Sequence, residues 1–480
     1  ITFEEAKELS KGYKVVPISM EIMSDIRTPM QVLRILKGVS SHCYMLESVE
    51  NQEKWGRYTF LGYDPKLEIT CTNGVMTVKN GKTEVSEVKH PGEKIKEILK
   101  EYTSPKIKEL PTFTGGLVGY FSYDYIKYSE PKLNLDANDE EGFKDVDLML
   151  FDKVIAFDNF SQKIIVIANA RTENLREDYN RCVDEINKII ELIRTGEMVE
   201  VNPGKITSEF RPLFTEKEYC EMVEKAKHYI YEGDIFQVVL SNRLEADYEG
   251  SLLNAYRVLR TINPSPYMFY FSSDDIEVAG ASPETLVKLE DGVLHTFPLA
   301  GTKPRGKNKE EDDELEKILL TDEKERAEHN MLVDLGRNDI GKISEINSVK
   351  VDKYMSIEKF SHVMHIGSTV SGTLRSDKDA LDAIDSILPA GTLSGAPKLR
   401  ACEIINELEG NKRGIYGGAI GYIDFTGNLD MCISIRLAFA KNGKVFVRSG
   451  AGIVADSVPE NEYEECINKS KAVINALNIA

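Results

Sequence analysis

The chain has 480 residues, 41% of them hydrophobic and 29% charged, which is typical of a globular protein with room for about two to four domains. Its formal net charge of −19 disfavours nucleic acid as a partner, because contacts with phosphates need a basic face. No apolar run reaches the ~18 residues of a transmembrane helix, and the acidic start ITFEEAKELS does not resemble a signal peptide. Seven scattered cysteines without a C-x-x-C pair predict free thiols in a cytoplasmic protein, with no disulfide framework and no zinc site.

The first third of the chain predicts antiparallel β-structure with helices attached. Within residues 66–88, Asn73-Gly74 and Asn80-Gly81 are hairpin signals between β-rich runs. Residues 147–170 predict two further strands around a polar turn. A long amphipathic helix is expected over residues 173–196, ending at a glycine.

A stretch without periodicity follows that helix and contains prolines and a glycine. We interpret residues 201–214 as a linker between an N-terminal region, 1–200, and a second domain, 215–480. The second domain begins with a capping box at Thr215 and contains a hairpin at Asn442-Gly443. Strands do not alternate one-to-one with helices, so the pattern predicts an α+β fold with large antiparallel sheets covered by helices.

The stretch FPLAGTKPRGKN, residues 297–308, nearly matches a phosphate-binding loop. Asn308 stands where that motif needs a Ser or Thr for Mg²⁺, and Pro304 removes a backbone N–H donor. The acidic KEEDDELEK that follows would oppose a triphosphate. The sequence therefore predicts a corner between a strand and a loop with a different role.

Two predicted helices each carry an E-x-x-E pair, Glu325/Glu328 and Glu462/Glu465, whose spacing places both carboxylates on one helical face. Taken singly, such pairs are typical of solvated faces in a chain with 79 acidic residues. If the two helices face one another, the four carboxylates would suit Mg²⁺, which binds oxygen ligands and keeps several waters. A di-iron site is disfavoured because it needs E-x-x-H motifs.

Four long blocks, in order, carry a family resemblance: ERAEHNMLVDLGRNDIGKIS, AGTLSGAPKLRACEII, RGIYGGAIGYID and SGAGIVADSVPENEYEECINKSKA. Over residues 215–475 the chain resembles the chorismate-utilising enzymes. YMLESVE and TGGLVGYFSYD extend the resemblance toward anthranilate synthase component I and its relative aminodeoxychorismate synthase. The resemblance implies a β/α sandwich and a Mg²⁺-dependent reaction in which a nucleophile enters chorismate and a hydroxyl departs.

Two positions distinguish the branches of this family. Its water-adding members use a lysine base where this chain has Gln237, so isochorismate and salicylate synthases are disfavoured. Aminodeoxychorismate synthases typically place a nucleophilic lysine where this chain has Ala300. The resemblance therefore favours addition of ammonia at C2 and loss of pyruvate to give anthranilate, the first committed step of tryptophan biosynthesis. Aminodeoxychorismate synthase component I and a catalytically inactive tryptophan-sensing subunit are the alternatives.

The resemblance also assigns roles to the carboxylates. Glu328 and Glu465 are similar to direct Mg²⁺ ligands, and Glu325 and Glu462 to residues that act through metal-bound water. Glu284 resembles the general acid for the departing hydroxyl.

The remaining roles concern the C2 proton and the substrate. His365 resembles the base that takes the C2 proton, and Tyr416 and Arg436 resemble a clamp on the enolpyruvyl carboxylate. The residues expected to bind the substrate are Thr302, Thr392, Tyr416, Arg436, Gly450, Ala451, Gly452 and Lys469.

MLESVE and NPSPYMFY resemble the family's tryptophan-binding signature. They predict one allosteric pocket between the N-terminal region and the catalytic domain, with Glu47 pairing with the ligand's ammonium. The expected pocket residues are Leu46, Glu47, Ser48, Pro266, Tyr267, Met268, Tyr422 and Cys432. The chain has no recognisable glutaminase motif, so we expect ammonia from a separate glutamine amidotransferase subunit.

Overall fold

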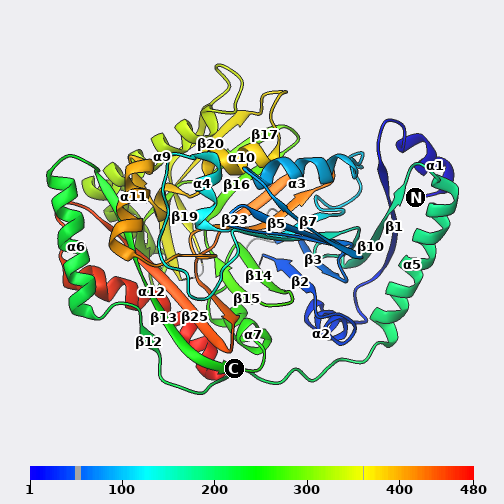
Figure 1. The fold of residues 1–480 in the computed structure, drawn as a ribbon, viewed down its shortest axis with the longest axis horizontal. Helices are drawn as coiled ribbons and strands as arrows, with labels where there is room; N and C mark the ends of the chain where they lie inside the picture. The colour runs from blue at the N-terminus through cyan, green and yellow to red at the C-terminus, as the bar shows by residue number, and fades with distance from the viewer. Residues whose placement is uncertain (49–55, 361) are drawn as a thin grey trace.

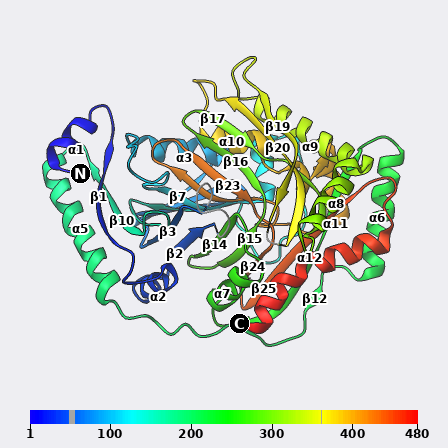
Figure 2. The same cartoon turned by 180° about the vertical axis from the view of Figure 1, so that it is seen from behind.

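The computed structural model describes residues 1–48, 56–360 and 362–480. They form two large antiparallel β-sheets with helices on the outer faces (Figures 1 and 2). This architecture confirms the predicted α+β class with large antiparallel sheets covered by helices.

The first sheet contains strands from both parts of the chain. In spatial order these are β1 (Val15–Met23), β10 (Lys163–Arg171), β9 (Lys153–Asp158), β3 (Tyr58–Tyr63), β2 (Cys43–Glu47), β14 (Tyr267–Ser272), β15 (Glu277–Ser282), β24 (Leu437–Lys441), β25 (Lys444–Ile453), β13 (Gln237–Glu249) and β11 (Lys205–Ile206). Two short strands, β12 (Arg211–Pro212) and β21 (Gly395–Ala396), also pair with β13.

The second sheet is mixed in the same way. In spatial order it contains β18 (Leu299–Pro304), β20 (Val363–Thr373), β17 (Val293–Thr296), β16 (Thr285–Glu290), β23 (Leu429–Ile433), β22 (Ala419–Asp424), β7 (Gly116–Phe121), β8 (Val146–Phe151), β4 (Leu67–Thr72), β5 (Val75–Asn80) and β6 (Lys82–Glu87), with β19 (Lys350–Lys359) paired to β20. Since β2 pairs with β14 and β7 with β22, residues 1–200 and 215–480 share both sheets.

Hydrophobic side chains fill three layers. An aromatic layer between the sheets packs Phe271 and Phe446 of the first sheet with Tyr120 and Tyr422 of the second. Outside the first sheet lie α1 (Phe3–Leu9), α2 (Pro29–Val39), α5 (Leu175–Thr195), α7 (Leu253–Ile262) and α12 (Pro459–Ile479). Outside the second lie α3 (Pro91–Lys100), α4 (Ile126–Ser129), α9 (Glu323–Gly341) and α10 (Ala380–Ile387). Helices α6 (Glu216–Tyr231) and α11 (Lys398–Glu409) cover β13 at one end.

Most local predictions are confirmed. The two Asn-Gly turns in residues 66–88 join β4 to β5 and β5 to β6, and Asn442-Gly443 joins β24 to β25. Thr215 caps α6 through the predicted capping box. In the stretch that resembles a phosphate-binding loop, β18 leads into α8 (Lys309–Thr321), and the Asn308 side chain accepts a hydrogen bond from Glu311 N at 2.9 Å as the helix N-cap.

One local prediction is wrong. Residues 147–170 contain parts of three strands instead of two, because the chain passes from β8 in the second sheet to β9 in the first at Asp152. An almost continuous apolar run conceals this change of sheet, since both strands are buried on both faces. The linker 201–214 stays a prediction, and within it the two-residue strands β11 and β12 pair with β13.

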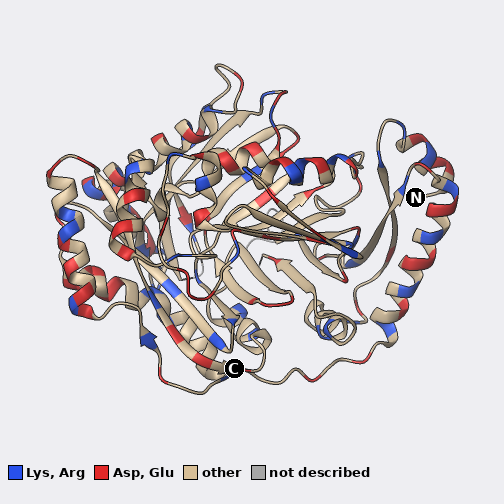
Figure 3. Ribbon diagram, viewed as in Figure 1, with Lys and Arg blue, Asp and Glu red and all other residues tan. Residues whose placement is uncertain are grey.

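Acidic and basic residues are interspersed along the outer helices, as on α5 and α6 in Figure 3. Within the described ranges, no helix is long and apolar enough to cross a membrane.

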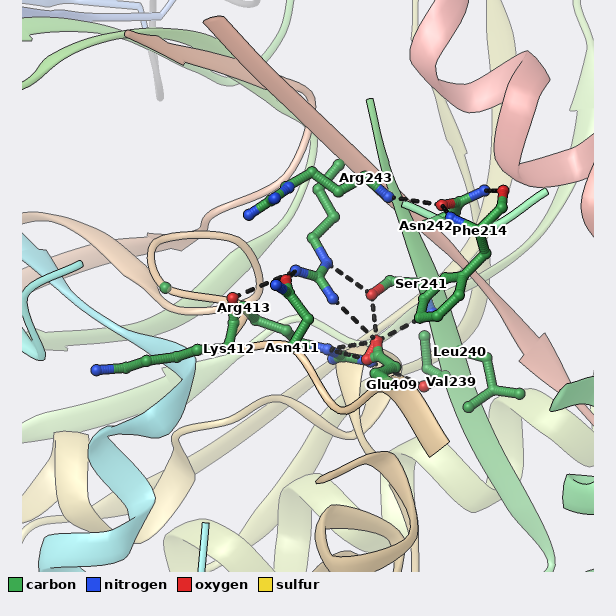
Figure 4. Close-up of polar contacts among 12 residues, drawn as sticks. Phe214, Val239, Leu240, Ser241, Asn242, Arg243, Glu409, Asn411, Lys412 and Arg413 are labelled. Carbon is green, nitrogen blue, oxygen red and sulfur yellow. Dashed lines mark hydrogen bonds and ion pairs between the residues drawn. The ribbon is translucent and has the colours of Figure 1, made fainter. Parts of the chain in front are cut away.

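A buried ion pair lies where α11 meets β13 (Figure 4). Arg413 Nε lies 3.0 Å from each carboxylate oxygen of Glu409, and both side chains are 1% exposed. The two other nitrogens of the guanidinium donate to backbone carbonyls, Nη1 to Leu393 O at 2.5 Å and Nη2 to Val239 O at 2.9 Å. The pair therefore joins three chain segments that are distant in sequence.

A second arginine completes this cluster from β25. Arg448 Nε donates to Ser241 Oγ at 2.9 Å, and Arg448 Nη2 lies 3.6 Å from Glu409 Oε1. Burial lowers the pKa of Arg448 to about 10, although the Glu409 carboxylate opposes the shift. Two arginines thus depend on one buried carboxylate for their charge balance.

We predict that Glu409→Gln lowers the free energy of unfolding by about 3–5 kcal/mol, because it leaves two buried guanidinium groups without a counter-charge. Urea denaturation measures the loss. Glu403→Gln on the same helix is the control, since its pair with Arg400 is exposed and contributes about 1 kcal/mol or less. A loss below that of the control would contradict the structural role of the cluster.

Candidate active site

A cavity of about 440 Å³ lies beside α9, α12 and the strands β13, β18, β20 and β25. Every predicted catalytic, substrate-binding and metal-binding residue except Ala451 lines it. These are Gln237, Glu284, Ala300, Thr302, Glu325, Glu328, His365, Thr392, Tyr416, Arg436, Gly450, Gly452, Glu462, Glu465 and Lys469. Ala451 is fully buried in the core beneath α6 and α11, because alternation along β25 turns its methyl group away from its two glycine neighbours.

A divergence between two strands of the first sheet opens this cavity. β24 pairs with β25 only from Ala438↔Val447 to Lys441↔Lys444, while β25 continues to Ile453 along β13. At the start of β24, Arg436 has a φ of 55°, a left-handed conformation that is uncommon for a non-glycine residue. Such strain is concentrated at functional sites, and here it accompanies a guanidinium that lines the cavity.

Two glycines of β25 give neighbouring side chains room to line the cavity. A Cβ on Gly452 would lie 2.5 Å from Gln237 Nε2, and a Cβ on Gly450 would lie 2.8 Å from Tyr416 Oη. Position 450 is also confined by the backbone carbonyl of Leu240, 3.1 Å from such a Cβ, whereas at position 452 the Cβ would displace the end of the Gln237 side chain.

The two E-x-x-E pairs line the same cavity from two helices, α9 and α12, as their spacing predicted. Burial raises the pKa of Glu328, Glu325 and Glu462, and a neighbouring glutamate raises each one further. Mutual repulsion of this kind favours a bound cation.

The four carboxylates fit Mg²⁺ only with added ligands. Among the described residues, no three of them bring an oxygen each within 4.8 Å of the others. Mg²⁺ uses one or two protein carboxylates and completes its shell with waters and substrate, so this open arrangement suits it.

The cavity also contains an anion-binding half. The Arg436 guanidinium donates no hydrogen bond to another described residue, and burial lowers its pKa without removing its charge at neutral pH. Lys469 Nζ donates to Gly450 O at 2.9 Å and lies 2.7 Å from Glu465 Oε1. Lys469 therefore stands between the acidic half and the basic half.

Glu284 is a protonated acid at neutral pH. Enclosure by protein raises the pKa of its carboxyl to about 8, against the lowering effects of a hydrogen bond from Thr392 and the charges of Lys469 and Arg436. Thr392 Oγ1 lies 3.3 Å from Glu284 Oε1. A carboxylic acid at this pKa is a competent proton donor near pH 7.

His365 is arranged as a proton acceptor. Its Nδ1 lies 2.9 Å from the carbonyl oxygen of Gly301, which only accepts, so Nδ1 carries the proton and Nε2 retains its lone pair. Burial lowers the pKa of His365, which keeps the ring neutral. Thr302 Oγ1, 3.2 Å from Nδ1, helps to fix the ring.

A second cavity of about 290 Å³ contains the other predicted set. All eight expected residues line it: Leu46, Glu47, Ser48, Pro266, Tyr267, Met268, Tyr422 and Cys432. It lies across the β2–β14 pairing, where residues 1–48 meet the rest of the first sheet. Val49 and Glu50 of the MLESVE motif are outside the described residues.

The Glu47 side chain has partners other than a ligand. Its Oε1 lies 2.5 Å from Arg260 Nε and accepts a hydrogen bond from the Tyr256 hydroxyl at 2.7 Å. Both partners belong to α7, so the carboxylate is engaged with the helix that covers the sheet.

Sequence reasoning missed several residues that line these cavities. Lys324 and Arg448 line the first, and Arg57, Lys288 and Asp430 line the second. An arginine inside the apolar strand pattern KVFVRSG was the available signal for Arg448, because an isolated charge is rarely buried without a role.

The chorismate binding enzyme family model matches residues 41–475 of this chain. The chain belongs to that family. It is 46% identical to anthranilate synthase component 1 of Acetivibrio thermocellus, over 100% of this chain and 98% of that protein. It is 45% identical to anthranilate synthase component 1 of Aquifex aeolicus, with the same coverage.

Two solved structures agree with the fold. Anthranilate synthase component I from Streptococcus pneumoniae superposes with a TM-score of 0.78 at 39% identity, covering 94% of this chain and 98% of that one. The menaquinone-specific isochorismate synthase of Escherichia coli superposes with a TM-score of 0.72 at 18% identity, covering 99% of this chain and 98% of that one, and so shares the fold.

We predict that Gly452→Ala lowers the turnover of chorismate roughly ten- to a hundredfold. The added Cβ would lie 2.5 Å from Gln237 Nε2 and would push the Gln237 amide out of its position in the cavity. Steady-state kinetics and thermal melting test this. Gly341→Ala on α9 is the control, since a Cβ there meets nothing within 4 Å. Equal kinetics in the two variants would show that Gln237 tolerates displacement.

Proposed function

We propose that this chain converts chorismate and ammonia to anthranilate and pyruvate, as the first component of an anthranilate synthase in the cytoplasm. The observation that carries the proposal is the pair of residues at the two positions that distinguish the family's branches. Gln237 and Ala300 both line the cavity, and neither is the lysine that water addition or covalent amination requires. Ammonia must then attack C2 itself. The relatives named anthranilate synthase component 1 support the same conclusion.

The basic half of the cavity would bind the chorismate dianion. Arg436 offers a planar guanidinium for the enolpyruvyl carboxylate, and Tyr416 lies beside it. Glu328 and Glu465 would hold Mg²⁺, with Glu325 and Glu462 contacting its waters. The metal would supply positive charge to the ring carboxylate.

Proton transfers are assigned to two residues on the cavity wall. Glu284 donates its proton to the C4 hydroxyl, which departs as water while ammonia forms a bond to C2. The ammonium group formed at C2 then releases one proton to water, giving aminodeoxyisochorismate. His365 Nε2 then takes the C2 proton. The C–H electrons complete the aromatic ring, and the enolpyruvyl ether bond breaks to release pyruvate, whose methyl group takes up a proton.

The name of the relatives, component 1, supports a separate subunit that supplies ammonia. We propose that this partner is a glutamine amidotransferase. The alternative, aminodeoxychorismate synthase component I, is opposed by Ala300, and an inactive sensor is opposed by the complete set of polar residues in the cavity.

Incubation with chorismate, Mg²⁺ and ammonium tests the reaction, and the fluorescence and mass of the product identify anthranilate. Glu328→Gln and Glu465→Gln should abolish turnover without lowering the melting temperature, because each removes charge from the metal site. Glu325→Gln should lose less activity if it acts through water. Full activity in the first two variants, or a para-substituted product from the wild type, would contradict the proposal.

The rate should be pH-dependent on the alkaline side. Glu284 donates only while protonated, so at a fixed concentration of free ammonia the rate should be constant below pH 8 and fall about tenfold per pH unit above it. Thr392→Val should move this limb to higher pH, because the Thr392 hydroxyl stabilises the charged carboxylate. An unshifted limb in that variant would assign the titration to another group.

We propose that L-tryptophan binds in the second cavity and inhibits the enzyme. Pro266 and Met268 offer apolar contacts to an indole. Because Glu47 is paired with Arg260 and Glu290 with Lys288, we assign the ligand's ammonium to the third acidic group of this cavity, Asp430.

A hydrogen-bonded route supports coupling between the two cavities. The Tyr267 hydroxyl, in the second cavity, lies 3.0 Å from Thr285 Oγ1 and 2.7 Å from Asp430 Oδ1. Thr285 directly follows Glu284 and lies at a register shift between β16 and β23. A ligand that moves Tyr267 can therefore act on the backbone that carries the acid.

We predict that Thr285→Val keeps tryptophan binding but weakens inhibition roughly five- to a hundredfold, because it removes the hydroxyl that joins the cavities and keeps the side-chain shape. The rise in melting temperature with tryptophan measures binding, and anthranilate formation measures inhibition. Thr285→Ser retains the hydroxyl and is the control. Unchanged inhibition in Thr285→Val would contradict this route. If tryptophan neither inhibits the wild type nor raises its melting temperature, the proposed tryptophan site is wrong.

A further inference from the structure

A small chamber of about 50 Å³ adjoins the substrate cavity at Glu284. The two cavities share three lining residues, Glu284, Thr392 and Leu332. The hydrogen bond from Thr392 to Glu284 thus lies in the wall between them. Leu335 and Gly391, which also line the chamber, are partly exposed, so the lining of the chamber reaches the protein surface.

The size of the chamber restricts its contents. A water molecule needs roughly 10–15 Å³ of such volume, so the chamber holds a few waters and excludes chorismate. The chamber contains a polar anchor for water, because Thr296 is 6% exposed and its Oγ1 has no hydrogen-bond partner among the described residues. Buried hydroxyl groups without a protein partner are normally satisfied by water.

The chamber depends on a glycine of α9. A Cβ on Gly336 would lie 3.1 Å from Thr296 Oγ1 and 3.7 Å from Pro298 Cγ, so a larger side chain there would occupy the chamber and cover the hydroxyl. Gly336 has an ordinary helical backbone, because its φ is not positive. The limited space around this position, and not its backbone conformation, therefore favours glycine here.

The proposed reaction requires a source of protons for Glu284. Each turnover breaks the C4–O bond, transfers the Glu284 proton to the departing oxygen and leaves a carboxylate and a water molecule, while the new ammonium group at C2 releases one proton to solvent. Glu284 must regain one proton before the next turnover. Lys469 and Arg436 face it from the substrate side, and bound substrate fills that side.

We propose that the chamber is a water-filled proton path that recharges Glu284 from solvent through Thr296. The proton passes along waters held by the Thr296 and Thr392 hydroxyls. Gly336 is a positioning residue that keeps the path open. The proposal rests on the general-acid role given to Glu284 under the proposed function.

Gly336→Val tests the path by filling the chamber. At saturating chorismate and ammonium, kcat should fall roughly tenfold while the KM for chorismate stays within about twofold, because reprotonation follows substrate binding. The solvent deuterium isotope effect on kcat should rise, since proton delivery becomes rate-limiting. Gly341→Val on the same helix is the matched control, because that position is open.

Thr296→Val and Thr296→Ser form a second pair that does not depend on filling the helix interface. The valine variant removes the hydroxyl, so it should lower kcat and raise the isotope effect as Gly336→Val does. The serine variant keeps a hydroxyl and should restore both values. Wild-type kcat and isotope effect in both Gly336→Val and Thr296→Val would overturn the proton path.

The acid role of Glu284 and the proton path through the chamber can be tested separately. Full activity in Glu284→Gln would overturn the acid role itself, and with it the task of the chamber. A strongly impaired Glu284→Gln together with normal Gly336→Val and Thr296→Val would overturn the chamber alone. A rise in KM without a change in the isotope effect would assign Gly336 to packing and would equally overturn the path.

Discussion

The ion pair between Glu409 and Arg413 is the interaction on which the geometry of the cavity depends. Both side chains are 1% exposed, so the cost of burying the two charges is offset only while every donor has a partner. Those partners are the backbone of β13, two residues from Gln237, and the carbonyl of Leu393, which follows Thr392. Arg448, tied to the same carboxylate, lies two residues before Gly450. One buried carboxylate thus sets the relative position of three cavity walls.

The division of the fold into two sheets determines how two cavities can communicate. The second cavity is lined by residues of both sheets, including Met268 from β14 and Tyr422 from β22. The substrate cavity also uses both, through Gly450 of β25 and Ala300 of β18. Close-packed layers transmit a displacement without absorbing it. A change in how the sheets pack at one cavity can therefore reach the other, and the hydrogen bond between Tyr267 and Thr285 lies on the route that we propose.

The sequence predicted the elements with strong local signals, and those signals fail where tertiary structure decides. Asn-Gly turns and the capping box at Thr215 were identifiable because each depends on a few adjacent residues. The crossing from one sheet to the other at Asp152 was not, since strands buried on both faces have no period that reveals their sheet. The set of cavity residues was foreseen from the family resemblance, whereas spacing alone supported only the carboxylate pairs. Ala451 shows the limit of prediction from a motif. The motif identifies the position, but the alternation of side chains along β25 determines whether the side chain lines the cavity.

The charge arrangement of the cavity explains why a chain of net charge −19 can receive a dianion. Four glutamates on α9 and α12 repel an anion, and burial together with repulsion already raises the pKa of three of them. Arg436, and Lys469 between the two halves of the cavity, attract it. Without a cation, an entering anion would be repelled by the glutamates while Arg436 and Lys469 attract it. We therefore expect the anion and the cation to bind in a mutually dependent way. A cation among the glutamates removes the repulsion, and the anion adds ligands that the open set of carboxylates lacks. Because neither half of the cavity is electrostatically complete alone, the site favours the pair over either ion singly.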